Sequence, residues 1–141
     1  MTLYLDTSVL VAALTREPRS GAVLAWLDAQ QPDQLTISEW VVTEFSSALS
    51  IKLRTGQITA TERAEALSAF ARLCAEGVTV LPISGLHFRM AARIADQHTL
   101  GLRAGDALHL AICADHGAAL HTLDRRLSEA GPALGVQTAT L

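Results

Sequence analysis

Four carboxylates in this chain occupy positions at which an acidic side chain can take part in catalysis or metal binding. Asp6 and Asp124 each follow a short apolar run of the kind that forms a buried strand. Asp106 opens an apolar helical pattern, and Glu44 lies on the apolar side of another one. Because a buried glutamate is seldom found without a partner, the four acids are candidates for one shared site.

Four carboxylates in one cleft would repel one another strongly. Two carboxylates about 4 Å apart repel by about 4 kcal/mol at an effective dielectric constant near 20, and the sum over all pairs would be a large share of a domain's net stability of about 5–15 kcal/mol. Some of the acids must then be protonated, or cations must lie between them. Oxygen ligands without Cys or His favour Mg²⁺ or Mn²⁺ over zinc. The chemistry that such a site predicts is phosphoryl transfer by a metal-activated water.

Each acid also has an ordinary structural explanation. Asp6 and Asp106 could serve only as turn or helix-capping residues. Glu44 could form an ion pair with Arg54 or with another arginine. Asp124 could be a solvated helix cap. Taken singly, none of the four acids establishes a site.

Polar residues beside the acids could support the same site. Ser8 and Thr122 could orient the carboxylates through hydrogen bonds, or they could act only as a helix cap and a strand-end hydroxyl. Arg103, Arg125 and Arg126 flank two of the acids and could bind the phosphates of a substrate. Exposed arginine is also ordinary on any protein surface, so both interpretations stay open.

The histidines offer an alternative chemistry, because a histidine-based ribonuclease needs no metal and leaves a cyclic phosphate. The chain contains His87, His98, His109, His116 and His121. No two of them are spaced as a catalytic pair would be. His109 lies one turn from Asp106 and could contact it, although we expect a packed or partly exposed helix residue. His121 is expected at a strand end near Asp124.

The elements that must position these residues alternate between strand and helix. Strands are expected at residues 2–6, 35–37, 78–83, 119–122 and 136–138, and helices at residues 9–14, 20–29, 39–54, 59–76, 84–98, 106–116 and 124–129. This alternation predicts an α/β sandwich with a central, mainly parallel sheet covered on both faces. Ligands bind such sheets beyond the carboxyl ends of the strands, where Asp6 and Asp124 are placed.

The composition fits one domain with a sizeable core. Of the 141 residues, 50% are hydrophobic and 18% are charged, so we expect residues 1–141 to form a single domain. The net charge of −3 argues against a protein that coats nucleic acid by bulk electrostatics. It does not argue against a nuclease, because metal-binding carboxylates count as negative until the ions are bound.

The remaining sequence signals concern the compartment and the thiols. Cys74 and Cys113 form no zinc or redox spacing, so we expect reduced core cysteines. No signal peptide and no apolar run long enough to span a membrane are recognisable. We therefore expect a cytoplasmic protein with no membrane partner.

Four short motifs resemble those of PIN domains, and most closely those of VapC-type toxins from bacterial toxin–antitoxin pairs. The stretch from Leu5 to Leu10 resembles the first motif of the family, and Thr43-Glu44 followed by Ser47 to Leu49 resembles the second. Residues 102–111, around Asp106, resemble the third and most specific motif. Thr122-Leu123-Asp124 resembles the fourth. The resemblance covers nearly the whole chain, with no departure at the four acids.

This resemblance implies a PIN-like α/β/α sandwich and a Mg²⁺- or Mn²⁺-dependent endoribonuclease that leaves 5′-phosphate and 3′-hydroxyl ends. Asp6 and Asp106 would be the principal metal ligands. Glu44 and Asp124 would complete the site by holding a second metal or metal-bound waters. The resemblance also implies an RNA substrate, a homodimer and an inhibitory antitoxin as partners.

Two other classes of function are weighed against this one. A phosphatase of the haloacid-dehalogenase type also has an aspartate after its first strand, but it needs a second aspartate at the place that Ser8 occupies. A non-catalytic module that binds RNA or protein would tolerate loss of the acids. The apolar stripes of the helices at residues 39–54 and 59–76 should be mostly core, although part of them could receive a partner helix.

Overall fold

Five parallel strands form the central sheet of the computed structural model, which describes residues 1–141. They are β1 (Leu3–Leu5), β2 (Leu35–Ser38), β3 (Thr79–Leu81), β4 (Ala119–Thr122) and β5 (Thr138–Thr140). Their order across the sheet is β3-β2-β1-β4-β5, and every neighbouring pair is parallel. The predicted α/β class and the mainly parallel sheet are confirmed.

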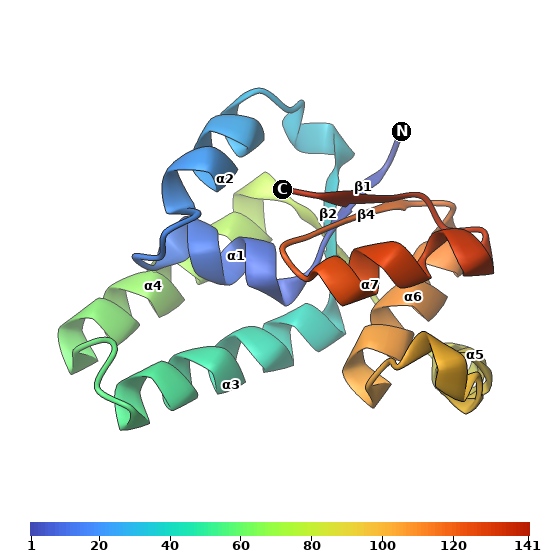
Figure 1. Ribbon diagram of the computed structural model, residues 1–141. Helices are drawn as coiled ribbons and strands as arrows, with labels where there is room; N and C mark the ends of the chain where they lie inside the picture. The colour runs from blue at the N-terminus through green and yellow to red at the C-terminus, as the bar shows by residue number, and fades with distance from the viewer.

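Seven α-helices flank the sheet. They are α1 (Thr7–Leu14), α2 (Ser20–Asp28), α3 (Glu39–Arg54), α4 (Ala60–Arg72), α5 (Gly85–Asp96), α6 (Ala104–His116) and α7 (Arg125–Ala130). In Figure 1, α1 to α4 lie to the left of β1 and β2, and α5 to α7 lie to the right. Helix α1 contacts α2, α3 and α4, while α5 packs along α6. The sheet is therefore the middle layer of a sandwich.

The strand order creates a switch point between β1 and β4. From β1 the chain moves outward through β2 to β3, then crosses back through α5 and α6 to β4 and continues to β5. Parallel crossovers are right-handed, so connections that run in opposite directions place their helices on opposite faces. The loops after β1 and β4 consequently diverge, and a crevice opens at the carboxyl ends of these two strands.

The core is aliphatic, as the scarcity of aromatic residues requires. Helix α6 is buried on almost all sides, and each residue from Ala107 to Cys113 is buried. Cys113 and the partly buried Cys74 are free thiols, as predicted, and burial raises the pKa of both. On the stripes of α3 and α4, Val41 and Phe70 are core residues. No helix is both long and apolar enough to cross a membrane.

Several element boundaries differ from the sequence prediction, and two of them illustrate local causes. Helix α4 ends at Arg72, and residues 73–77 form a wider π-helical turn that ends at Gly77. A side chain at residue 77 would collide with Leu73, because a Cβ there would lie 2.7 Å from Leu73 Cδ1. The last strand begins at Thr138, two residues later than predicted, and the backbone N–H of Val136 instead donates to the carbonyl oxygen of Gly131 and closes the turn around the short 3₁₀ helix (Pro132–Leu134).

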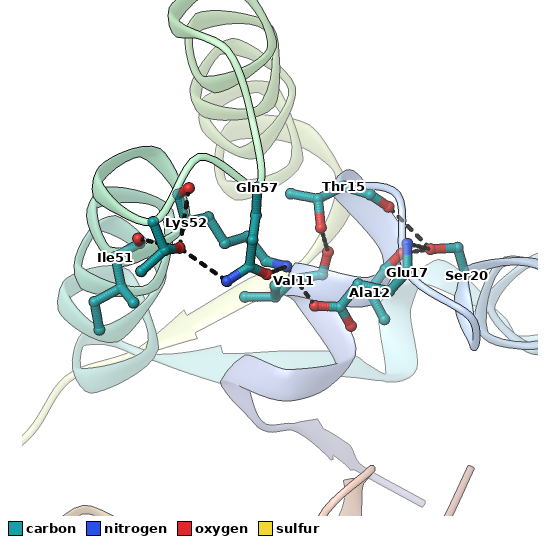
Figure 2. Close-up of polar contacts among 9 residues, drawn as sticks. Val11, Ala12, Thr15, Glu17, Ser20, Ile51, Lys52 and Gln57 are labelled. Carbon is teal, nitrogen blue, oxygen red and sulfur yellow. Dashed lines mark hydrogen bonds and ion pairs between the residues drawn. The ribbon is translucent and has the colours of Figure 1, made fainter.

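The loop between α1 and α2 is attached to the end of α3 by polar contacts (Figure 2). Lys52, the only lysine in the chain, reaches from α3 to Glu17 in this loop, with a distance of 2.9 Å between Nζ and Oε1. Ser20 Oγ donates to the carbonyl oxygens of Ala12 and Thr15, and it accepts from the backbone N–H of Glu17. These contacts order the loop that connects α1 to α2.

Candidate active site

Asp6 and Asp124 lie at the switch point, each at the start of a helix. Asp6 is the first residue after β1 and the N-cap of α1, where its carboxylate accepts from the backbone N–H of Val9. Asp124 follows β4 and is the N-cap of α7, where it accepts from the backbone N–H groups of Arg126 and Leu127. The capping role considered for both residues is therefore real, and it coexists with their placement at the sheet edge.

Two hydroxyl groups fix the Asp6 carboxylate, which is only 4% exposed. Ser8 Oγ donates to Oδ1 of Asp6 over 2.5 Å, and Thr122 Oγ1 donates to Oδ2 over 2.5 Å. The same hydroxyl oxygens accept backbone N–H groups, Ser8 from Leu123 and Thr122 from Asp124. Ser8 and Thr122 thus connect the end of β1 to the end of β4.

Glu44 lies in the second turn of α3 and faces the same edge. Its Oε1 accepts from Thr7 Oγ1 and from His109 Nε2, each over 2.6 Å. An ion pair between Glu44 and Arg54 or another arginine was the alternative from the sequence, and it is wrong. The partner is His109, which lies one turn after Asp106 on α6.

Asp106 lies in the first turn of α6, near the positive end of the helix dipole. The sequence placed the start of this helix at Asp106, but the helix begins at Ala104, and Arg103 occupies the N-cap position. The interpretation of Asp106 as a cap is therefore wrong. Burial and the charges of Asp124 and Glu44 raise the pKa of its carboxylate, which faces these two acids, while the backbone N–H of Arg103 lowers it.

Three of the four acids line one open cleft of about 650 Å³. The lining residues are Trp40, Glu44, Gly101, Arg103, Gly105, Asp106, Asp124 and Arg126. Asp6 is too deeply buried to line the cleft, but Thr122 joins it to the backbone of Asp124. Arg125 is not part of the lining, because its side chain points to Glu129 and forms an exposed ion pair.

The acids carry negative charge that no arginine or lysine compensates, and His109 is the one basic side chain that contacts them. Burial raises the pKa of Asp6 above its ordinary value. Burial, and then the charge of Asp124, raise the pKa of Asp106. No arginine or lysine forms an ion pair with any of the four acids. Burial also opposes ionisation of Glu44, but hydrogen bonds from His109 and Thr7 lower its pKa below the ordinary value.

The donor set fits a hard divalent cation. All four side chains offer carboxylate oxygens, and Oε2 of Glu44 makes no hydrogen bond within the protein. Oxygen ligands of this kind suit Mg²⁺ or Mn²⁺. A cation would also remove the repulsion that raises the pKa of Asp106.

Comparison with known proteins assigns the fold family. The profile of the PIN domain family matches residues 3–131 of this chain. The chain is a member of the PIN domain family. No curated protein sequence gives a significant match.

Solved structures of other proteins share the fold at low sequence identity. Mycobacterium tuberculosis VapC20, described as a sarcin-ricin loop cleaving toxin, superimposes with a TM-score of 0.75 at 19% identity over 92% of this chain and 95% of that one. FitAcB from Neisseria gonorrhoeae gives a TM-score of 0.70 at 18% identity over 97% and 96% of the two chains. VapBC2 from Rickettsia felis, bound to a fragment of its promoter DNA, gives a TM-score of 0.68 at 15% identity over 100% of this chain and 99% of that one. These similarities establish the fold.

One functional candidate of this PIN domain was missed at the sequence level. His109 is packed, which was one of the two expected states, because it is 2% exposed; its hydrogen bonds at both ring nitrogens, with Tyr4 and Glu44, were not expected. The available signal was its spacing of three residues from Asp106 on the apolar stripe of α6. The side chain of His121 forms no hydrogen bond with any of the acids, and only its backbone carbonyl accepts from the backbone N–H of Asp6. It packs against Trp26 with ring centroids 4.7 Å apart, and burial lowers its pKa.

A second group of potential ligands lies at the other end of α6, formed by His87, Asp115 and His116. His87 Nδ1 accepts from the backbone N–H of Ser84 over 3.0 Å, so its Nε2 carries the hydrogen and donates to Asp115 Oδ2 over 2.8 Å. A metal ion bound to Nε2 of His87 would require the ring hydrogen to be on Nδ1. That hydrogen would then point at the backbone N–H of Ser84, which is also a donor. The geometry suits a hydrogen bond between α5 and α6 rather than a metal site.

Proposed function

We propose that this PIN-domain protein is a metal-dependent endoribonuclease and the toxin of a toxin–antitoxin pair of the VapC type. The observation that carries the proposal is the convergence of Asp6, Glu44, Asp106 and Asp124 at one sheet edge, with no basic side chain paired to them except His109. Asp6 and Asp106 are assigned as the principal ligands of Mg²⁺ or Mn²⁺. Glu44 and Asp124 complete the site.

When bound, such an ion lowers the pKa of a coordinated water and neutralises charge on the RNA phosphate. The side chains of the protein do the positioning. Ser8 and Thr122 hold the Asp6 carboxylate through one oxygen each. Hydrolysis at this site would break the bond between phosphorus and the 3′-oxygen, which would take up a proton, and would leave a 5′-phosphate and a 3′-hydroxyl on the RNA.

Arginines at the cleft are suited to hold the RNA backbone. Arg103 and Arg126 are exposed and line the cleft beside Asp106 and Asp124. Guanidinium groups bind phosphate oxygens in a two-pronged geometry. We assign phosphate binding to Arg103 and Arg126, and we leave Arg125 out because of its contact with Glu129.

Two kinds of protein partner belong to the proposal. The fold neighbours include VapBC structures and a structure described as a toxin–antitoxin complex from Klebsiella pneumoniae. By analogy we propose an antitoxin partner and a homodimer for this chain. The large exposed apolar side chains of α5, Leu86 at 47% and Phe88 at 57%, support a protein contact on that helix.

The test compares the wild type with Asp6→Asn on a mixed RNA pool in Mg²⁺, Mn²⁺ or EDTA, with chemical analysis of the new ends. Metal-dependent cuts with 5′-phosphates in the wild type, reduced at least about 10²-fold in the variant, are expected because a principal ligand has lost its charge. Cuts that survive EDTA and leave cyclic phosphates would instead assign the chemistry to a histidine. Full activity of folded Asp6→Asn would contradict the assignment of Asp6.

A further inference from the structure

A continuous chain of hydrogen bonds runs from the core to the acid site. Ser38 Oγ lies 2.7 Å from Tyr4 Oη, and Tyr4 Oη lies 2.8 Å from His109 Nδ1. On the other side of the ring, His109 Nε2 lies 2.6 Å from Glu44 Oε1, which also accepts from Thr7 Oγ1. The five residues come from β2, β1, α6, α3 and α1, so the chain joins elements from both faces of the sheet.

Burial leaves the residues of this hydrogen-bond chain with few alternative hydrogen-bond partners. Tyr4 and Ser38 have no exposed surface, and His109 is 2% exposed. Ser38 occupies the N-cap position of α3 without capping it, so its hydroxyl is available to Tyr4. Breaking any one contact would leave a buried polar group without a partner.

The protons of the chain have one arrangement that satisfies every group without a further partner. The ionised Glu44 carboxylate has no proton to give, so His109 Nε2 donates to it. In a neutral imidazole Nδ1 is then the acceptor, and Tyr4 Oη–H donates to it. Ser38 Oγ–H donates in turn to the oxygen of Tyr4. The chain therefore fixes the tautomer of His109.

The two oxygens of Glu44 are used differently. Both donors, Thr7 and His109, bind Oε1. Oε2 makes no hydrogen bond and lies beside Gly105 in the cleft wall, 3.1 Å from the point that a Cβ at residue 105 would occupy. The carboxylate is consequently held by one oxygen and presents the other one to the cleft.

We propose that His109 is a positioning residue of the acid site, which together with Tyr4 and Ser38 orients Glu44 so that Oε2 faces the bound cation. This inference rests on the proposed function. His109 itself touches neither the cation nor the RNA, and it acts through Glu44. Loss of an outer partner of a metal ligand reduces metal affinity or activity about 10–100-fold.

The protein also contains a matched control for the positioning role of His109. His87 is also buried on a neighbouring helix, is 4% exposed and donates from Nε2 to a carboxylate, that of Asp115. It lies at the other end of α6 and outside the cleft. Variants of His87 therefore report the general cost of losing a buried histidine–carboxylate bond.

The experiment measures Mn²⁺ affinity by calorimetry, together with kcat and KM for RNA, in His109→Leu, His109→Gln and Tyr4→Phe. Leucine removes the donor, while glutamine keeps an N–H donor near the position of Nε2. We expect His109→Leu to weaken Mn²⁺ binding about 10–100-fold and to lower kcat at an unchanged KM. Compared with His109→Leu, His109→Gln should restore most of the Mn²⁺ affinity and most of kcat. His87→Leu and His87→Gln should lower the melting temperature without changing Mn²⁺ affinity.

The ¹⁵N shifts of the imidazole nitrogens give a readout that needs neither metal nor RNA, and they should show His109 with its hydrogen on Nε2. Unchanged Mn²⁺ affinity in His109→Leu, equal losses in the His109 and His87 series, or a hydrogen on Nδ1 of His109 would each overturn the inference. A wild type that binds Mn²⁺ but cleaves no RNA would contradict the proposed nuclease, and the Mn²⁺ series would still decide the role of His109. A wild type that binds no Mn²⁺ would overturn both.

Discussion

Individual side chains of the acid site carry two roles at once. Asp6 caps α1 and also lies at the centre of the hydroxyl contacts that join β1 to β4. Asp124 caps α7 and also lines the cleft. Capping therefore does not exclude a role in the proposed metal site for these two residues, since the carboxyl end of a parallel strand is also where the next helix begins.

The absence of a side chain at residue 105 is as important as the acids around it. A methyl group on Gly105 would lie 3.1 Å from Glu44 Oε2 and 3.2 Å from Trp40 Nε1. We expect Gly105→Ala to displace the Glu44 carboxylate, lowering the RNA cleavage rate at least several-fold with a stability change below about 1 kcal/mol. Cleavage assays and thermal melts check this. Gly21→Ala is the control, because no atom lies near a Cβ there.

At the level of elements, α6 has a different task at each end. Its first turn carries Asp106 to the cleft, and its middle carries His109 into the core. Its last turn is joined to α5 by the bond between His87 and Asp115. The packing of α5 on α6 thus sets the position of the helix that supplies two of the polar residues of the site.

The bond between α5 and α6 can be tested through Asp115. Asp115→Ala should leave Nε2–H of the buried His87 without an acceptor and lower the free energy of unfolding by about 1–3 kcal/mol. Because the residue is remote from the cleft, cleavage at temperatures where the variant is folded should be unchanged. Glu129→Ala, which removes an exposed ion pair with Arg125, should cost less than about 0.5 kcal/mol by chemical denaturation. Equal losses of unfolding free energy in Asp115→Ala and Glu129→Ala would contradict a stabilising hydrogen bond between His87 and Asp115.

The stability of the whole molecule is linked to the charge of the cleft. Burial raises the pKa of Asp6 and Asp106 above their ordinary value of 3.8, so the folded metal-free protein keeps these protons to a higher pH than the unfolded chain does. Their contribution to stability is present below pH 3.8 and is lost as the pH rises through the raised pKa values. Glu44 acts in the opposite direction, because its pKa is lowered from 4.5 and its contribution disappears as the pH falls.

Asp6→Asn tests this linkage without any RNA. In EDTA at neutral pH the variant should melt at the same temperature as the wild type or several degrees above it, because a buried charge has been removed. One kcal/mol corresponds to about 3–5 °C for a domain of this size. Adding Mg²⁺ or Mn²⁺ should raise the melting temperature of the wild type more than that of the variant. Calorimetric scans at pH 4.5 and 7.5 check the sign of the change in stability. An Asp6→Asn variant less stable than the wild type at both pH values would disprove the linkage.

The sequence by itself determined the class of the fold and most of its elements, because short β-rich runs and longer helical patterns differ in period and length. It located α3 within its observed bounds and β4 likewise. It also placed Asp6 and Asp124 at the functional edge, because both follow strands directly. These features depend only on local sequence and on the general geometry of parallel sheets.

Only the tertiary structure decided which side chains meet. The partner of Glu44 is His109, 65 positions further along the chain, and Tyr4 reaches the same ring across 105 positions. Arg125 points away from the cleft while its neighbour Arg126 lines it. No local pattern encodes such contacts, because they result from the order of strands in the sheet and from the angle at which α6 packs beside β4.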